Sequence, residues 1–344
     1  MSPILDSLPI VILYPHSRCN CRCVMCDIWK DSNESEIGES ELERHLSDFK
    51  RLSVQWVVLS GGEPLMHSDL FRLCALLKKH DIRITLLSTG LLLERNAASI
   101  VESIDDVIVS LDGPPEIHDQ IRRVKGAFAR LERGVAALHN LHPEFSISAR
   151  STVQRRNCLY LRSTAAAARR IGLESISFLA ADVTSQAFNR VNVWDLAKQD
   201  EIALRKQDIL PLQQEVNRLI EEWGDSGFVR ESPEKLHRIV EHFRAHLNLR
   251  PAVAPQCNAP WVSAVIESDG VVRPCFFHKK IGTLPGRSFL EVLNSPEAQD
   301  FRRHLDVATN PICRRCVCSL NFRALQSFYS APTTSMPAES YARL

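Results

Sequence analysis

The chain has 344 residues, of which 44% are hydrophobic and 24% charged, and its formal net charge is +1. Such a composition is typical of a globular protein with room for a barrel-sized domain and a smaller one. The balanced charge argues against nucleic acid or an anionic membrane as partner. We find neither a signal peptide nor an apolar run of membrane-spanning length, and we therefore expect a cytoplasmic protein.

Eleven cysteines in such a protein indicate metal binding or catalysis, because the cytoplasm keeps thiols reduced. Four of them lie within eight residues, at Cys19, Cys21, Cys23 and Cys26. Without Cys21, the spacing is Cys-x3-Cys-x2-Cys, three thiolates with His16 as the only local fourth ligand for a zinc ion. A cluster of four irons held by three cysteines would instead leave one iron open to a substrate or cofactor.

Apolar strand patterns alternate with helical ones through the first half of the chain. A capping box formed by Ser40 and Glu43 is expected to start the first helix. Six strand-then-helix units predict a parallel sheet covered by helices, either open or closed into an incomplete barrel. The expected strands cover residues 9–14, 54–59, 82–87, 107–111, 145–153 and 175–179, and the helices about 40–49, 68–80, 94–104, 126–141 and 159–171.

The fifth expected strand favours the barrel. Its residues alternate between an apolar and a polar face, so one side of the sheet is able to line a wet cavity. The apolar positions are Phe145, Ile147 and Ala149, and the polar ones are Ser146, Ser148 and Arg150.

The second half of the chain changes character. Residues 185–249 read as a helical linker, and strands over 261–267 and 271–277 flank the hairpin signal Asp269-Gly270. Short helices over 289–293 and 296–305 follow, and the tail from about residue 327 has the composition of a disordered segment. We expect a barrel over residues 1–184, a linker over 185–250, a small cysteine-containing α+β domain over 251–325 and a disordered tail over 326–344.

Two motifs together resemble the radical S-adenosylmethionine (radical SAM) superfamily: the cysteine triad after the first strand, and Gly61-Gly62-Glu63-Pro64 after the second. The resemblance implies a partial (β/α)6 TIM-type barrel, with the cluster at the carboxyl ends of the strands. It also implies a [4Fe-4S] cluster whose open iron binds S-adenosyl-L-methionine (SAM). Reductive cleavage of SAM would give a 5′-deoxyadenosyl radical that takes a hydrogen atom from the substrate.

The resemblance assigns further residues to SAM. Glu63 would accept hydrogen bonds from the methionyl amino group, and Gly61 and Gly62 would allow close approach of the backbone. Pro64 completes this cofactor-binding turn. Arg150 would pair with the methionyl carboxylate. Each residue also has an ordinary structural interpretation, as a loop, a strand-end hydroxyl or a salt-bridge partner. The other expected contacts are Ser88, Ser110 and Asp112, and Met25 stands where the family usually has an aromatic residue.

The C-terminal cysteines have the spacing of a complete four-thiolate site. Taken alone, a hairpin cysteine pair followed by Cys-x2-Cys would be a zinc ribbon. Beside a radical SAM barrel it resembles the SPASM and Twitch extensions, which implies one auxiliary [4Fe-4S] cluster, either an electron relay or a substrate site. The expected ligands are Cys257, Cys275, Cys313 and Cys316, with Cys318 as an alternative ligand, a core thiol or a hydrogen donor.

We therefore expect a radical SAM oxidoreductase that receives electrons from a donor such as flavodoxin or ferredoxin. A small-molecule metabolite is the preferred substrate, since the barrel begins within about ten residues of Met1 and leaves no room for a leader-binding domain. A peptide substrate is the alternative, and a non-enzymatic zinc or iron-sulfur protein is the second alternative. The sequence does not identify the substrate.

Overall fold

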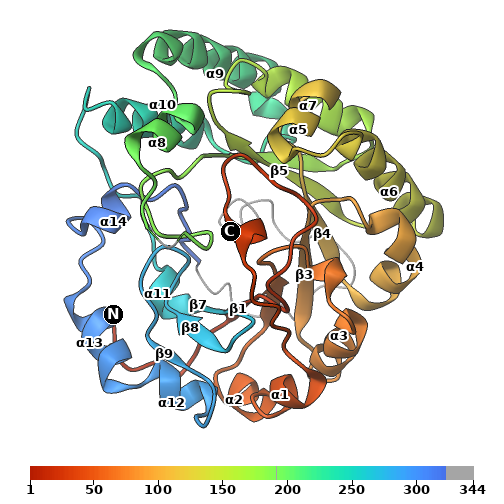
Figure 1. Ribbon diagram of the computed structural model, residues 1–344, viewed down its shortest axis with the longest axis vertical. Helices are drawn as coiled ribbons and strands as arrows, with labels where there is room; N and C mark the ends of the chain where they lie inside the picture. Colours follow the sequence, from red (N-terminus) through yellow and green to blue (C-terminus); the bar gives the residue numbers. More distant parts are fainter. Residues whose placement is uncertain (191, 323–344) are drawn as a thin grey trace.

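The computed structural model describes residues 1–190 and 192–322. The predicted tail over 326–344 lies outside the described residues, as does the end of the predicted last domain. Six parallel strands stand side by side in chain order and curve around the centre of the molecule, with helices on their outer side (Figure 1). These strands are β1 (Ile10–Leu13), β2 (Trp56–Leu59), β3 (Arg83–Ser88), β4 (Asp106–Ser110), β5 (Ile147–Val153) and β6 (Ser175–Ala180).

The predicted α/β class and the parallel sheet are confirmed. Strands β1, β2 and the first four residues of β4 are completely buried, as expected for a sheet covered on both faces. The covering helices are α1 (Glu39–Glu43), α2 (Leu46–Arg51), α3 (Leu70–Lys78), α4 (Leu93–Ser103), α5 (Pro115–Arg122), α6 (Ala127–Leu141) and α7 (Leu161–Arg170).

Two details of these helices differ from the sequence predictions. The expected capping box is wrong: α1 begins at Glu39 with Gly38 as its N-cap, so Ser40 already has a helical backbone and does not cap the helix. Helix α5 was missed because it has only eight residues. Its signals were Pro115 in the first turn and an acidic residue after it.

The expected linker is helical. It contains α8 (Leu196–Ile202), α9 (Ile209–Trp223) and α10 (Pro233–His246). Helix α9 packs on α7 and α10, and α10 packs on β6, so this segment covers the open side of the barrel next to the last parallel strand.

The C-terminal region extends the same sheet. Strand β7 (Ser263–Ile266) pairs in parallel with β1, with Val265 opposite Ile12, and β8 (Val271–Arg273) and β9 (Gly282–Thr283) follow in antiparallel order. The domain boundaries therefore stay a prediction, since strands from both predicted domains share one sheet. The remaining helices are α11 (Ala259–Val262), α12 (Phe289–Leu293), α13 (Pro296–His304) and α14 (Pro311–Arg314).

The hairpin forms at Asp269-Gly270 as predicted, with Gly270 at φ +80°. Its strands are shorter than expected. Trp261 belongs to α11, and β8 ends at Arg273 because Pro274 has no N–H to donate to the ladder. The chain is thereby free to turn at Cys275.

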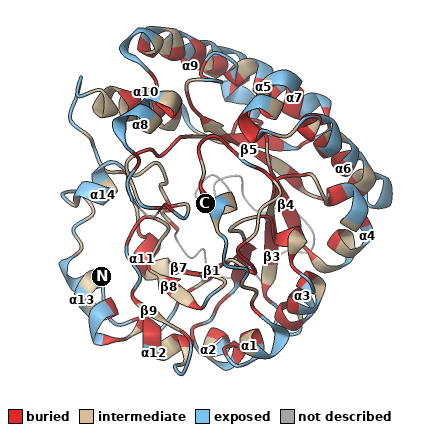
Figure 2. Cartoon of the chain, in the orientation of Figure 1, coloured by how far each residue is buried: buried red, intermediate tan, exposed pale blue. Residues whose placement is uncertain are grey.

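The core is continuous between the barrel and the C-terminal region. Buried residues follow the strands and the inner faces of the helices, whereas the outer faces are exposed (Figure 2). Phe289 of α12 packs on Phe49 of α2 with ring centroids 5.4 Å apart, and both side chains are buried. None of the helices that the structure describes has both the length and the apolar character that a bilayer crossing requires.

We predict that Phe289→Ala lowers the free energy of unfolding by about 3–5 kcal/mol, because it leaves a cavity between α12 and α2. Urea denaturation followed by circular dichroism measures the loss. Leu141→Ala, at a side chain 57% exposed, is the control and should change stability by less than about 0.5 kcal/mol. Equal effects of the two substitutions would contradict the inferred packing.

Candidate active site

Three cysteines of the loop after β1 face one cavity. This cavity holds about 240 Å³ and lies at the carboxyl ends of the parallel strands, where Cys19, Cys23 and Cys26 form part of its wall. The other expected site residues divide into two groups. Gly61, Gly62, Ser88, Ser110, Arg150 and Met25 line the cavity, whereas Glu63, Pro64 and Asp112 do not.

The turn after β2 packs directly against the cysteine loop. The Glu63 amide donates to the carbonyl of Arg18 over 2.9 Å. A Cβ atom on Gly62 would lie 1.9 Å from that carbonyl oxygen, and one on Gly61, at φ +94°, would lie 2.7 Å from the Tyr14 ring. Glycine is therefore required at both positions, and the backbone of this turn, with no side chain, forms the cavity wall.

The Glu63 carboxylate points away from the cavity, in contrast to its expected role at the methionyl amino group. It is fully buried and accepts hydrogen bonds from Ser88 Oγ, from the Thr89 amide at 2.7 Å and from Thr89 Oγ1 at 2.6 Å. Burial raises the pKa of Glu63, and these hydrogen bonds oppose the rise. The carboxylate thus joins the ends of β2 and β3, a role that sequence spacing did not reveal.

His16, the one local candidate for the fourth ligand of a zinc site, has both ring nitrogens in hydrogen bonds. Its Nδ1 accepts from the Arg18 amide at 3.0 Å, so its Nε2 carries the proton and donates to the Glu63 carbonyl at 2.5 Å. The ring is 1% exposed, and burial lowers its pKa. His16 therefore fixes the loop backbone and does not turn toward the thiols.

Asp112 forms a buried ion pair with Arg122 at 2.5 Å instead of facing the cavity. Its other carboxylate oxygen accepts from the Thr152 amide at 2.8 Å. The Arg122 guanidinium in turn donates to Cys23 Sγ over 3.4 Å. Sequence reasoning assigned Asp112 to SAM and missed Arg122, because α5, which carries Arg122, was not predicted.

Helix α5 also holds the cysteine loop through its backbone. The amides of Arg22 and Val24 donate to the carbonyls of Arg122 and Ile121, so the loop is held on both sides of Cys23. A hydrogen bond from the buried Cys21 lowers the pKa of Cys23 to about 6, against the rise from burial and together with the charge of Arg122. Arg122 and Cys21 thus both donate to Cys23 Sγ. Cys21 therefore has a function, the stabilisation of the Cys23 thiolate, that its position in the motif did not suggest.

Arg150 is a buried cation in the wall of the cavity. Its Nε donates to Ser177 Oγ at 3.2 Å. Burial lowers the pKa of Arg150, and among residues 1–190 and 192–322 the attraction of Cys318 and Glu231 only partly opposes this effect. A buried cation of this kind calls for an anionic ligand, which agrees with the expected pairing to a carboxylate.

The segment after β6 closes over the loop. Arg190 pairs with Asp182 at 2.6 Å, and it donates to the Met25 carbonyl at 3.3 Å. Trp194 Nε1 donates to Asp27 at 2.7 Å, and its ring lies 3.8 Å from the Arg190 guanidinium carbon. Sequence reasoning missed these residues, since no local pattern in the linker points to the cysteine loop.

The C-terminal cysteines line a second, mostly apolar chamber of about 50 Å³. His278, which was not predicted, lies with its Nε2 3.3 Å from Cys313 Sγ. Burial raises the pKa of Cys313 to about 12. Of these thiols, Cys318 also lines the cavity of the first loop. The chamber contains Cys257, Cys275, Cys313, Cys316 and Cys318.

Both sets of thiols suit iron-sulfur clusters. All eleven cysteines are free, and the thiols of each set converge on one chamber. Within the described ranges, no three His, Cys, Asp or Glu side chains meet tightly enough to share one metal ion. Thiolates around a cluster bind separate irons and stand farther apart than the ligands of a single ion.

Comparison with known proteins agrees with this site. The family model of the radical SAM superfamily matches residues 13–153, and that of the iron-sulfur cluster-binding SPASM domain matches residues 257–317. Residues 13–153 therefore carry a radical SAM domain, and residues 257–317 carry a SPASM domain. The cofactors of the chain are accordingly a [4Fe-4S] cluster and SAM, with auxiliary iron-sulfur binding in the SPASM domain.

Several relatives resemble parts of this radical SAM chain. The Fe-coproporphyrin III synthase of Methanosarcina barkeri is 33% identical over 157 residues, which cover 44% of this chain and 39% of that protein. The subtilosin biosynthesis protein AlbA of Bacillus subtilis is 25% identical over 289 residues, 81% of this chain and 58% of AlbA. The chain thus spans about two fifths of the first relative and less than two thirds of the second.

Solved structures share the fold. Streptococcus suis SuiB bound to its precursor peptide SuiA aligns with a TM-score of 0.64 and 15% identity, over 92% of this chain and 72% of SuiB. The structure of anSMEcpe with bound AdoMet aligns with the same TM-score and 19% identity, over 89% of this chain and 86% of that protein. At these identities the likeness concerns the fold alone.

We predict that Gly62→Ala displaces the cysteine loop, because the new methyl group would overlap the Arg18 carbonyl. Iron bound after anaerobic reconstitution should fall by about half as the site of the first loop is lost. Gly38→Ala is the control, since no atom lies within 4 Å of a Cβ at that position. Full iron loading of Gly62→Ala would contradict the close approach.

We also predict that the Arg122–Asp112 pair raises the reduction potential of the cluster held by Cys23, since a donor to a ligand sulfur stabilises the reduced state. The double variant Arg122→Met, Asp112→Asn avoids an unpaired buried charge. Its potential should be lower by about 60 mV, which corresponds to about 1.4 kcal/mol for one electron.

Redox titration monitored by electron paramagnetic resonance measures this shift. The matched control is Arg123→Met, Glu201→Gln, which removes a neighbouring, more exposed ion pair with a 3.5 Å separation. An unchanged potential in the Arg122 variant, or the same shift in both variants, would refute the tuning.

Proposed function

We propose that this protein reductively cleaves SAM and abstracts a hydrogen atom from a small-molecule metabolite. The observation that carries the proposal is the convergence of three loop thiols, the Gly61–Gly62 backbone and the Arg150 guanidinium on one cavity. Three thiolates leave one iron of a cluster without a protein ligand, and Arg150 supplies the cation that a methionyl carboxylate requires.

Cys19, Cys23 and Cys26 would hold the catalytic cluster, which supplies one electron to the bound sulfonium. With SAM bound, the cluster would supply the electron for reductive cleavage of the C5′–S bond, and the adenosyl group released would take a hydrogen atom from the substrate. Among the chain's own residues, Gly61 and Gly62 allow close approach of the ligand, and the wall also contains Ser88 and Ser110.

The C-terminal thiols would hold one auxiliary [4Fe-4S] cluster. Cys257, Cys275, Cys313 and Cys316 are the proposed ligands, and Cys318 is the fifth thiol on the wall shared with the active-site cavity. A relay at this position would pass an electron between the substrate and the protein surface. We keep the domains proposed from the sequence, with the barrel over 1–184, the linker over 185–250 and the auxiliary domain over 251–325.

The preference for a small molecule rests on the more similar relatives. Proteins at 30% identity or above include the Fe-coproporphyrin III synthase of Methanosarcina barkeri and the GTP 3′,8-cyclase of Limosilactobacillus fermentum, each named for a small-molecule reaction. A peptide substrate is the second candidate, because AlbA, a bacteriocin biosynthesis protein, matches 81% of this chain. In either case the proposed reductant is a flavodoxin or ferredoxin, and the proposed compartment is the cytoplasm, where thiols stay reduced.

We predict that Cys23→Ala abolishes SAM cleavage and leaves the auxiliary cluster in place. Anaerobic reconstitution should load about eight irons per wild-type chain and about four in the variant. Formation of 5′-deoxyadenosine with dithionite, measured by liquid chromatography, reports cleavage. Cys74→Ala, at a buried cysteine in α3, is the control and should retain both properties.

Two outcomes would overturn the proposal. Cleavage by the Cys23 variant would show that the triad is wrong. Tightly bound zinc with no cleavage by the wild-type protein would favour a non-enzymatic metal protein. Deuterium transfer from candidate substrates into 5′-deoxyadenosine then identifies the hydrogen atom that is taken.

A further inference from the structure

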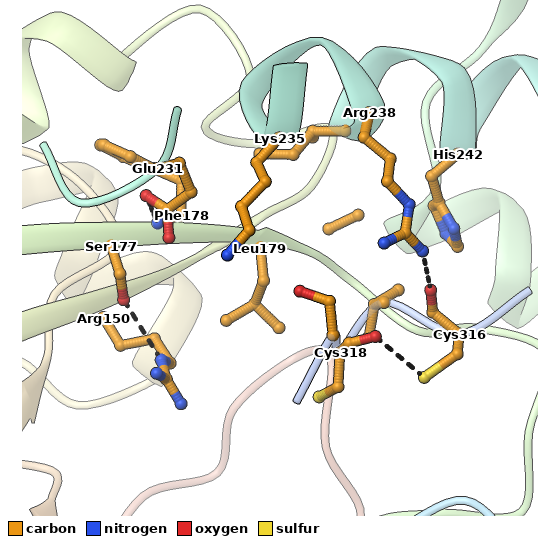
Figure 3. Close-up of a pocket in the computed structure, with 14 residues that line it drawn as sticks. Arg150, Ser177, Phe178, Leu179, Glu231, Lys235, Arg238, His242, Cys316 and Cys318 are labelled. Atoms are coloured by element: carbon orange, nitrogen blue, oxygen red, sulfur yellow. Dashed lines mark hydrogen bonds between the residues drawn. The ribbon is translucent and has the colours of Figure 1, made fainter. Parts of the chain in front are cut away.

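A small side chamber lies beside the auxiliary chamber (Figure 3). It holds about 60 Å³ and lies between the end of β6, helix α10 and the segment 316–319 that follows α14. Cys316 and Cys318 belong to the walls of both chambers, and Cys318 also lines the active-site cavity. Side chains that α10 places in this wall are therefore close to the thiols proposed to hold the auxiliary cluster.

Arg238 reaches from α10 to these cysteines. Figure 3 shows its side chain extending from the helix toward Cys316, and its Nη2 donates to the Cys316 carbonyl at 2.8 Å. Burial lowers the pKa of Arg238, and attraction to Cys316, Cys318 and Cys257 opposes this fall. Cysteines that bind iron are thiolates, so a cluster held here gives the guanidinium anionic neighbours.

Two carboxylates that lie one turn away on α10 do not neutralise Arg238. Glu241 pairs with Arg244 and lies 3.7 Å from Arg250. Glu234 is exposed in the first turn of the helix, where water screens its charge. The positive charge of Arg238 therefore acts mainly on the cysteines that follow α14.

We propose that Arg238 is a positioning residue of the auxiliary cluster, which holds the backbone at Cys316 and raises the reduction potential of the cluster. Reduction adds one negative charge to a cluster, and a cation close to the ligand sulfurs stabilises that charge. The hydrogen bond to the Cys316 carbonyl keeps the guanidinium at a fixed distance from the ligand loop. This inference deepens the proposed function, on which it rests, because it gives the linker helix a part in setting the potential of the auxiliary cluster.

Two substitutions of Arg238 separate its charge from its hydrogen bond. Arg238→Lys keeps the charge and Arg238→Gln removes it, and each new side chain still has an N–H group to offer the Cys316 carbonyl. Both substitutions are made in the full-length Cys23→Ala protein, which is expected to retain the auxiliary cluster alone. Redox titration of the reconstituted proteins, monitored by electron paramagnetic resonance, measures the potential of that cluster.

Reduction of the cluster should become at least tenfold less favourable in Arg238→Gln, which lowers the potential by about 59 mV for one electron. Arg238→Lys should retain most of the original potential. Arg244→Gln is the control, because it makes the same exchange on the same helix at an arginine that pairs with Glu241. This control should leave the potential unchanged.

The inference is overturned by an unchanged potential in Arg238→Gln, by equal shifts in Arg238→Gln and Arg238→Lys, or by an equal shift in Arg244→Gln. Loss of the auxiliary iron from either Arg238 variant would show a structural role alone and would also overturn it, as would zinc in place of the cluster.

SAM cleavage by the wild-type protein is measured separately and tests the proposed function. Cleavage with an unchanged potential in Arg238→Gln refutes only the inference about Arg238. A lowered potential in that variant without cleavage by the wild-type protein refutes only the proposed function.

Discussion

Hydrogen bonding of β1 on both of its edges is the constraint on which the site depends. On one edge β1 pairs in parallel with β2, whose end carries the Gly-Gly-Glu-Pro turn, and on the other with β7, which leads into the C-terminal cysteines. The cysteine loop leaves β1 between these two partners. Because parallel strands end at the same edge of a sheet, the three motifs meet there without any long connecting element.

Two acidic side chains that the sequence assigned to SAM binding instead stabilise this loop and its neighbours. Glu63 receives hydrogen bonds from Ser88 and Thr89, and Asp112 pairs with Arg122. Buried carboxylates need such partners, because an unpaired buried charge is costly. The cavity wall is left with backbone from the glycines, hydroxyl groups and the Arg150 guanidinium, a surface suited to a polar cofactor that carries a carboxylate.

The active-site cavity and the auxiliary chamber meet at Cys318, and the side chamber meets both there. Helix α10 closes this junction from the linker side, with Arg238 bound to the Cys316 carbonyl. The linker therefore contributes charge to the region where a substrate would lie, although its sequence carries no recognised motif. Proteins that share a fold often differ in substrate specificity through such connecting segments, because these segments vary in sequence more freely than the strands and helices of the barrel.

Sequence alone determined the alternation of strands and helices, the cysteine triad and the four C-terminal thiols, because these depend on local periodicity and on side-chain chemistry. It did not reveal the pairing of β7 with β1 or the ion pair between Asp112 and Arg122. Nor did it reveal the hydrogen bond from Cys21 to Cys23 or the side chamber between β6 and α10. Each of these joins residues far apart in the chain or depends on which way a side chain turns. Such contacts are set by packing of the whole barrel, and only the tertiary structure decides them.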